Sequence, residues 1–271
     1  MFAILSILTA VIVLAIAGWE DLKTREIPDY VSYFFIAAAI IIRLLWFLLE
    51  KDISILMWMP VSILVLGGFS YLMYVGGQWG GGDVKILLGT SLLLSSFPGE
   101  IIPFFANFLV NSLIVGAIYG TIGIGLVFFI HRKKIKTKWY EKAVLPAIIA
   151  AGILLVYFLP PLLAFLGIFI IIAFVSLAYF KRVEEVGFHQ KVAVEKLTEG
   201  DWLKDDVKLN GNVFLKKRKI GLTLGDIRKL KSSEKINKVW IKVGIPYSPV
   251  FLFTVIVTWI FGNILLRMVL I

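Results

Sequence analysis

Eight long apolar segments constrain this chain more than any other feature of its sequence. An apolar run of about 18 or more residues is long enough to cross a lipid bilayer as a helix. The composition agrees: 59% of the 271 residues are hydrophobic and the mean hydropathy is +0.92, whereas soluble domains average about 45–50% apolar residues. The segments lie at residues 2–19, 31–49, 53–76, 84–99, 103–130, 143–159, 162–180 and 246–270.

These segments predict an all-α polytopic membrane bundle of about eight transmembrane helices, within a range of six to eight. The first segment lacks a basic region before it, so we expect a retained helix rather than a cleaved signal peptide. Pro160 and Pro161 separate the sixth and seventh segments and favour a tight hairpin there. The alternative is one long, kinked segment, which would give seven spans.

Charge predicts the orientation, because basic residues collect in cytoplasmic loops. If the chain crosses eight times, one side carries 25 of the 28 Lys and Arg residues and the other side only Arg43, Lys51 and Arg267. We therefore expect a multi-pass plasma-membrane protein with both termini outside. Arg43 and Arg267 should reach outward from helix ends to the interface. The net charge of +10 predicts contact with anionic membrane lipids, and it requires no nucleic-acid partner.

Residues 184–243 are the only long polar stretch, and they predict a small, basic, cytoplasmic α+β domain. Strands are expected at 191–197 and 236–243. Asn210-Gly211 predicts a hairpin, and Thr223 to Asp226 resembles a capping box that opens a short helix. The expected organisation is a membrane protease domain at 1–183, this insert at 184–243, and a final transmembrane helix at 244–271.

Cysteine is absent and only two histidines occur. This excludes disulfides, a cysteine nucleophile and thiolate metal sites, and it argues against a His-rich zinc site. We therefore expect neither a metal nor a cofactor.

Acidic residues beside membrane spans are costly and are candidates for function. Asp83 follows five glycines within residues 76–82, and such a loop gives an extended peptide room to approach. Asp21 ends the first segment. Either acid alone could merely cap a helix, but the predicted topology brings both to the same side.

Two carboxylates that share one proton are the arrangement of an aspartic protease, and they would titrate as a unit. The alternative class is a transporter or channel with a paired-Asp ion or proton site. Such a protein should place its acids near mid-membrane and show an internal repeat, and no repeat is evident in this sequence. A non-catalytic scaffold is the third reading, and it would tolerate loss of both acids.

The motifs around these acids resemble one family. Residues 80–83 match the GxGD motif of intramembrane aspartyl proteases, and Lys85 extends it to GxGDxK. Residues 21–29 resemble the first-aspartate signature of type IV prepilin peptidases and archaeal preflagellin (prearchaellin) peptidases. Residues 245–249 resemble the Ile-Pro-Phe-x-Pro that opens the last span in that family.

The resemblance implies an aspartic endopeptidase that cuts after a short basic leader, the class III signal peptide, on the cytoplasmic side. It implies Asp21 and Asp83 as catalytic residues, and Gly80, Gly81, Gly82 and Lys85 as an active-site loop. Bacterial members often carry a cysteine-rich insert and methylate the new N-terminus. Because this chain has no cysteine, we expect the archaeal type without methyltransferase activity.

Four acids on an otherwise basic face suggest how the leader is recognised. We hypothesise that Glu20, Glu26 or Asp29, close to Asp21, attracts the basic leader. The simpler interpretation is ordinary loop solvation and helix capping.

Overall fold

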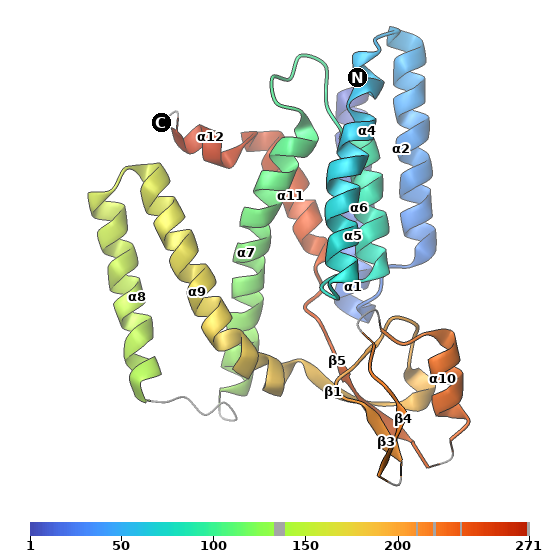
Figure 1. Cartoon of the computed structure of the whole chain (residues 1–271). Coiled ribbons are helices and arrows are strands. Elements are labelled where there is room, and N and C mark those ends of the chain that lie inside the picture. Colours follow the sequence, from blue (N-terminus) through green and yellow to red (C-terminus); the bar gives the residue numbers. More distant parts are fainter. Residues whose placement is uncertain (133–138, 210, 219–220, 234, 270–271) are drawn as a thin grey trace.

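The computed structural model describes residues 1–132, 139–209, 211–218, 221–233 and 235–269 (Figure 1). Within these residues a helical bundle is followed by a small β-containing insert and a last helical pair. The bundle helices are α1 (Phe2–Thr24), α2 (Asp29–Glu50), α3 (Ser54–Met57), α4 (Met59–Ser62), the π-helical turn η1 (Ile63–Gly67), α5 (Gly68–Val75), α6 (Gly81–Leu93), α7 (Phe104–His131), α8 (Trp139–Phe158), α9 (Pro161–Gly187), α11 (Ser248–Phe261) and α12 (Ile264–Val269).

The bundle packs through helix faces that the sequence spacing defines. On α1, buried residues recur at Ile7, Ala10, Leu14 and Ala17, which is the three-and-four spacing of one helix face. This face packs against α11, and α2 packs against α6. The α2–α6 approach is close because Gly89 faces the Phe35 ring, where a Cβ would lie 2.5 Å from a ring carbon.

Each predicted apolar segment contains helix in the described residues, but the 84–99 segment is helical only to Leu93, and the predicted last span is divided into α11 and α12 at residues 262–263. Pro160 separates α8 from α9, so that region forms two helices rather than one kinked helix. Among the described residues, four helical stretches meet the length and hydropathy of a membrane span: 2–24, 29–50, 54–75 and 104–131. The 13 residues of α6 and the 14 of α11 are shorter than a full crossing. Eight spans therefore stays a prediction.

Arg43 corrects one expectation. Its side chain does not extend to the interface but is fully buried on the packed face of α2. Nε donates to the Leu93 carbonyl oxygen at the end of α6 (2.9 Å), and a guanidinium nitrogen donates to the Ile55 carbonyl oxygen (3.2 Å). Arg43 thus ties α2 to α3 and to the end of α6.

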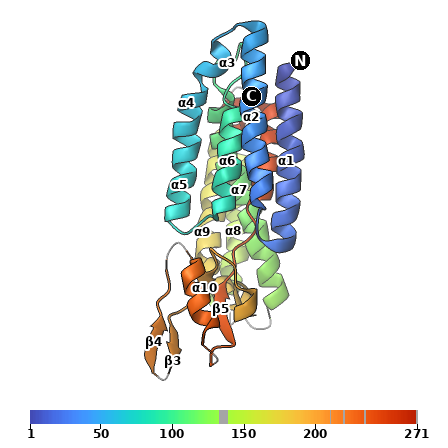
Figure 2. The ribbon, with the colours of Figure 1, turned by 90° about the vertical axis from the view of Figure 1, so that its right-hand side faces the viewer.

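The two ends of the bundle differ in what they carry. Figure 1 shows the turn between α1 and α2, the start of α6 and the insert at one end, with both chain termini at the other. Figure 2 shows the same arrangement after a quarter turn. The α8–α9 hairpin lies beside the bundle and contacts it through α7.

The insert has its own apolar core, formed by residues such as Leu203, Leu215 and Leu230. Strands β1 (His189–Ala193), β5 (Lys238–Lys242) and β2 (Trp202–Leu203) form an antiparallel sheet in the order β1-β5-β2. Strands β3 (Val207–Leu209) and β4 (Asn212–Leu215) form the predicted hairpin, although Asn210 of the predicted turn lies outside the described residues. A 3-10 turn, η2 (Val194–Lys196), follows β1.

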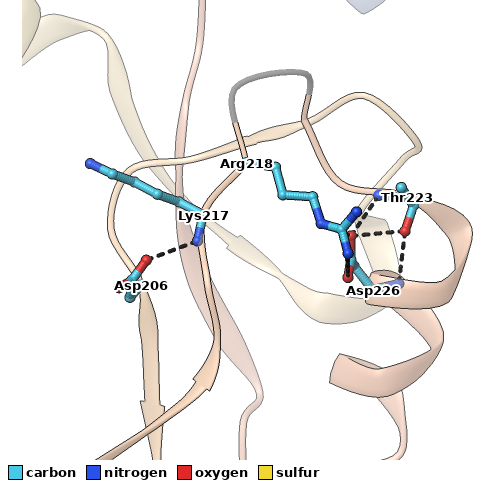
Figure 3. Close-up of polar contacts among 5 residues, drawn as sticks. All are labelled: Asp206, Lys217, Arg218, Thr223 and Asp226. Carbon is cyan, nitrogen blue, oxygen red and sulfur yellow. Dashed lines mark hydrogen bonds and ion pairs between the residues drawn. The ribbon is translucent and has the colours of Figure 1, made fainter.

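Helix α10 (Leu224–Lys231) begins at the predicted capping box. The Thr223 Oγ accepts the Asp226 N–H, and the Asp226 carboxylate accepts both the N–H and the hydroxyl of Thr223 (Figure 3). Arg218 completes this group through an ion pair with Asp226 at 3.1 Å. Beside it, the Asp206 carboxylate accepts the Lys217 backbone N–H, which joins the chain segments that flank the hairpin.

The insert and the segment that follows it contact the bundle at the α1–α2 turn. Arg25 donates a hydrogen bond to the Gly244 carbonyl oxygen at 3.0 Å, and the charge of Glu26 acts on Asp201. The Val243 N–H, just after β5, donates to the Phe188 carbonyl oxygen at 2.7 Å, next to an ion pair between Lys242 and Glu184. These contacts therefore fix the short segment that connects β5 of the insert to α11.

Candidate active site

Asp21 occupies the last turn of α1 and continues its packed face. It follows Ala17 by four residues, and its side chain is buried, with 7% of the residue exposed. One turn earlier, Gly18 lies against Pro249 of α11, where an added Cβ would come within 3.6 Å of backbone. This close approach brings the Asp21 carboxylate to the first residue of α11.

Ser248 supplies two hydrogen bonds to that carboxylate. Its backbone N–H donates to Asp21 Oδ2 at 3.1 Å, and its hydroxyl donates to the same oxygen at 2.8 Å. Because Ser248 is the first residue of α11, these bonds join the end of α1 to the start of α11. Asp21 therefore has two donors at one of its carboxylate oxygens.

Asp83 lies in the first turn of α6. Its Oδ2 accepts the Gly80 N–H at 3.1 Å, so the capping role that was open at the sequence level is present. Its other oxygen differs: Oδ1 is buried and has no hydrogen-bond partner among the described residues. A buried polar atom without a partner is costly, which marks this atom as available to a substrate or a water.

The glycines before Asp83 have separate roles. Gly77 has a φ of +66°, a conformation that few other residues adopt readily. Gly82 packs against Ile27, where a Cβ would lie 2.9 Å from the Ile27 Cβ. Gly81 has open space around it and, with Gly82, belongs to the first turn of α6. Gly80 precedes that turn in an extended conformation and supplies the N–H that Asp83 accepts.

The structure brings the two candidate acids together. Helices α1 and α6 pack against each other, and the charge of Asp21 acts repulsively on the Asp83 carboxyl. Two carboxylates so placed share a proton more readily than both ionise. This arrangement can activate a water with one acid while the other donates a proton to a carbonyl oxygen.

Lys85 and Asp29 form an ion pair at 2.6 Å between the start of α6 and the start of α2. The Lys85 ammonium also lies 5.2 Å from the Tyr33 ring centre. Lys85 therefore anchors the segment that carries Asp83. Asp29, which the sequence suggested for leader recognition, already has a basic partner within the protein.

Glu20 is partly exposed and Glu26 is fully exposed at the α1–α2 turn. Among the described residues, no ion pair joins either glutamate to a lysine of the insert. The charge of Glu26 instead acts on the like charge of Asp201. The turn therefore carries Glu20 and Glu26 together with the basic Lys23 and Arg25.

Sequence reasoning missed Ser248 and two aromatic neighbours. Trp79, just before the glycines, packs against Tyr247 with ring centres 5.0 Å apart. The charge of Asp83 also acts on the Tyr247 hydroxyl, and the charge of Asp21 acts on the hydroxyl of Tyr119, which lies on α7. Ser248 occupies the variable position of the motif at 245–249, so the motif itself gave no signal for it.

Comparison with known proteins agrees with this geometry. Residues 8–121 match the family model of the type IV leader peptidase family. The matched region contains Asp21, the glycines, Asp83 and Lys85, and it confirms the family resemblance seen in the motifs. A search of curated proteins found no match.

Proposed function

Because residues 8–121 match the model of the type IV leader peptidase family, we propose that the chain is a membrane aspartic endopeptidase. It removes the short basic leader, a class III signal peptide, from archaellin or type IV pilin-like precursors. Cleavage takes place at the cytoplasmic face of the plasma membrane, and Asp21 and Asp83 carry it out. The family itself indicates a protease that acts on a protein precursor.

One observation carries the proposal: two carboxylates from separate helices lie at one end of the bundle, where their charges interact. The family match over residues 8–121 favours a protease over the transporter alternative. Asp83 Oδ1, buried and without a partner among the described residues, supports a role in contacting substrate.

The direct test is cleavage of a purified precursor by membranes that contain the protein. The expected result is a shorter product from the wild type and none from Asp21→Asn or Asp83→Asn. Asp226→Asn serves as a matched control, because Asp226 is also a buried acid in a helix first turn. Normal cleavage by either dyad variant would contradict the assignment.

The substrate is identified by comparing archaellin and pilin precursors in the same assay. Mass spectrometry of the mature product with added S-adenosylmethionine tests the second part of the proposal. We expect a free, unmethylated N-terminus. A methylated product would overturn the expected archaeal, non-methylating type while leaving the protease assignment intact.

Leader recognition is proposed for Glu20, Glu26 and Asp29, which surround Asp21 in sequence. Their placement supports Glu20 and Glu26 most, since Asp29 is paired with Lys85. Glu20→Gln and Glu26→Gln should weaken cleavage of a basic leader, while cleavage of the same precursor with a neutral leader should be unchanged. Equal effects on both leaders would contradict this role.

A further inference from the structure

The two candidate catalytic acids have unequal surroundings. Asp21 Oδ2 accepts both the N–H and the hydroxyl of Ser248, and that residue opens the 14-residue helix α11. Hydrogen bonds from two donors favour the charged form of a carboxylate.

Asp83 has the opposite pattern. Its Oδ2 accepts a single N–H, from Gly80, and its buried Oδ1 has no partner among the described residues. An ionised Oδ1 would be a buried charge without a donor, which is expensive. A protonated Oδ1 can instead donate to an oxygen that arrives with the substrate.

We propose that Ser248 is a positioning residue that holds Asp21 in the ionised form, which makes Asp21 the base and leaves the shared proton on Asp83. This inference rests on the proposed peptidase function and adds to it the identity of each acid. It also gives Ser248 a role that none of the motif residues supplies.

The assignment defines the chemical step. Asp21 takes a proton from water as the water oxygen bonds to the scissile carbonyl carbon, and the carbonyl oxygen takes the proton of Asp83. The resulting gem-diol collapses when Asp21 returns its proton to the amide nitrogen and the C–N bond breaks. Asp83 recovers its proton from one hydroxyl of the diol, so a carboxylic acid and an amine leave and both acids return to their starting forms.

This step predicts how activity depends on pH. Activity requires one proton on the pair, so the kcat/KM profile falls along its acidic limb where the pair holds two protons and along its alkaline limb where it holds none. The titratable groups that face Asp21 are Asp83 of α6 and Tyr119 of α7, and Asp83 also faces Tyr247. Ser248 contacts only Asp21 of these, so its hydroxyl should affect the acidic limb alone.

The experiment measures kcat/KM against pH for a precursor substrate with the full-length protein. In Ser248→Ala the acidic limb should move up by about one pH unit, the size expected when a carboxylate loses one hydrogen-bond donor. The alkaline limb should stay in place, and Ser248→Thr should restore the wild-type profile. Thr254→Ala is the matched control, since that buried α11 hydroxyl donates to the Val250 carbonyl oxygen within its own helix and its loss should leave both limbs unmoved.

Because acid unfolding of a less stable variant would also move the acidic limb, each rate is divided by the folded fraction measured at the same pH. If Ser248→Ala is too weak to measure, Ser248→Cys, a poorer donor, should move the acidic limb up by less than about one pH unit. An unmoved acidic limb, or a shift that Ser248→Thr does not reverse, overturns the role of Ser248. Failure of the proposed function is distinct from this, because then Asp21→Asn and Asp83→Asn would cleave normally.

Discussion

The insert and the membrane bundle each place a carboxylate in the first turn of a helix, but they complete it differently. In the insert, Asp226 accepts hydrogen bonds from the N–H and hydroxyl of Thr223, and it pairs with Arg218 (Figure 3). In the bundle, Asp83 accepts one N–H, and its nearest acting charge is the like charge of Asp21.

This difference separates a structural acid from a reactive one. Capping a helix is common to both, so capping alone says nothing about catalysis. The sign of the neighbouring charge and the oxygen left without a donor are what distinguish the bundle acid. Changing one acid at a time tests this difference.

The largest difference should come from replacing Asp83 and Asp226, one at a time, with asparagine. Asp83→Asn should lower the cleavage rate by about 10²–10⁴-fold, since it removes a general acid, and it should leave thermal unfolding nearly unchanged. Asp226→Asn should leave the cleavage rate per folded molecule unchanged. Both variants are measured by precursor cleavage and by thermal unfolding in detergent. If Asp226→Asn slowed cleavage and Asp83→Asn did not, the proposed difference between the two acids would be wrong.

Arg43 offers the next largest effect, because the bundle also holds a structural charge. In Arg43→Leu the Leu93 and Ile55 carbonyl oxygens lose their donor, at a cost of about 1–3 kcal/mol for each buried group. Thermal unfolding should report this loss of stability. Arg267→Leu, which changes an exposed arginine on α12, is the control and should shift stability by no more than about 0.5 kcal/mol. An equal effect of the two variants would show that burial of Arg43 contributes nothing.

Asp226→Ala should destabilise the insert by about 1 kcal/mol, the usual cost of a lost helix cap. Burial alone would raise the pKa of Asp226, but hydrogen bonds from Thr223 and the charge of Arg218 outweigh it and hold the pKa below its usual value. Its stabilising contribution is therefore present above the unfolded pKa and is lost as pH falls through the folded pKa. Urea unfolding of the wild type in acid should show this loss, and Asp226→Ala should not.

The smallest effect belongs to Asp201, where the sign is reversed. Burial raises its pKa, a hydrogen bond from Thr198 works against this, and the charge of Glu26 adds to the rise. Its contribution to stability thus falls as pH rises from the unfolded pKa toward the folded one. Asp201→Asn should remove this dependence and change stability by no more than about 0.5 kcal/mol at neutral pH. A loss of stability at neutral pH would mean that the Asp201 charge is favourable.

Much of the fold could be predicted because its determinants are local. Apolar length located the helices, and an Asn-Gly pair and a capping box located the hairpin and α10. Arg43 was missed because an end-of-helix rule was applied. It follows Phe35 and Ala39 at four-residue spacing, on the face that the structure buries, and this register was the better signal.

The site was predictable in part. Asp21 extends the spacing of Ala10, Leu14 and Ala17 on α1, so its inward position could be predicted from periodicity. Its contact with Ser248 spans 227 residues, and no local pattern specifies which residue of α11 meets α1. That pairing depends on the packing of Gly18 against Pro249, which only the tertiary structure shows.

The central claim, that Asp21 and Asp83 act as one pair, is tested most directly by cross-linking. The chain has no cysteine, so Asp21→Cys with Asp83→Cys creates two thiols and no others. The shortest bifunctional methanethiosulfonate should bridge them, as it should bridge the positive control of Asp21→Cys with Ser248→Cys. It should not bridge Asp21→Cys with Lys51→Cys, whose second site follows the far end of α2. Bridging of the positive control without bridging of the aspartate pair would contradict the account.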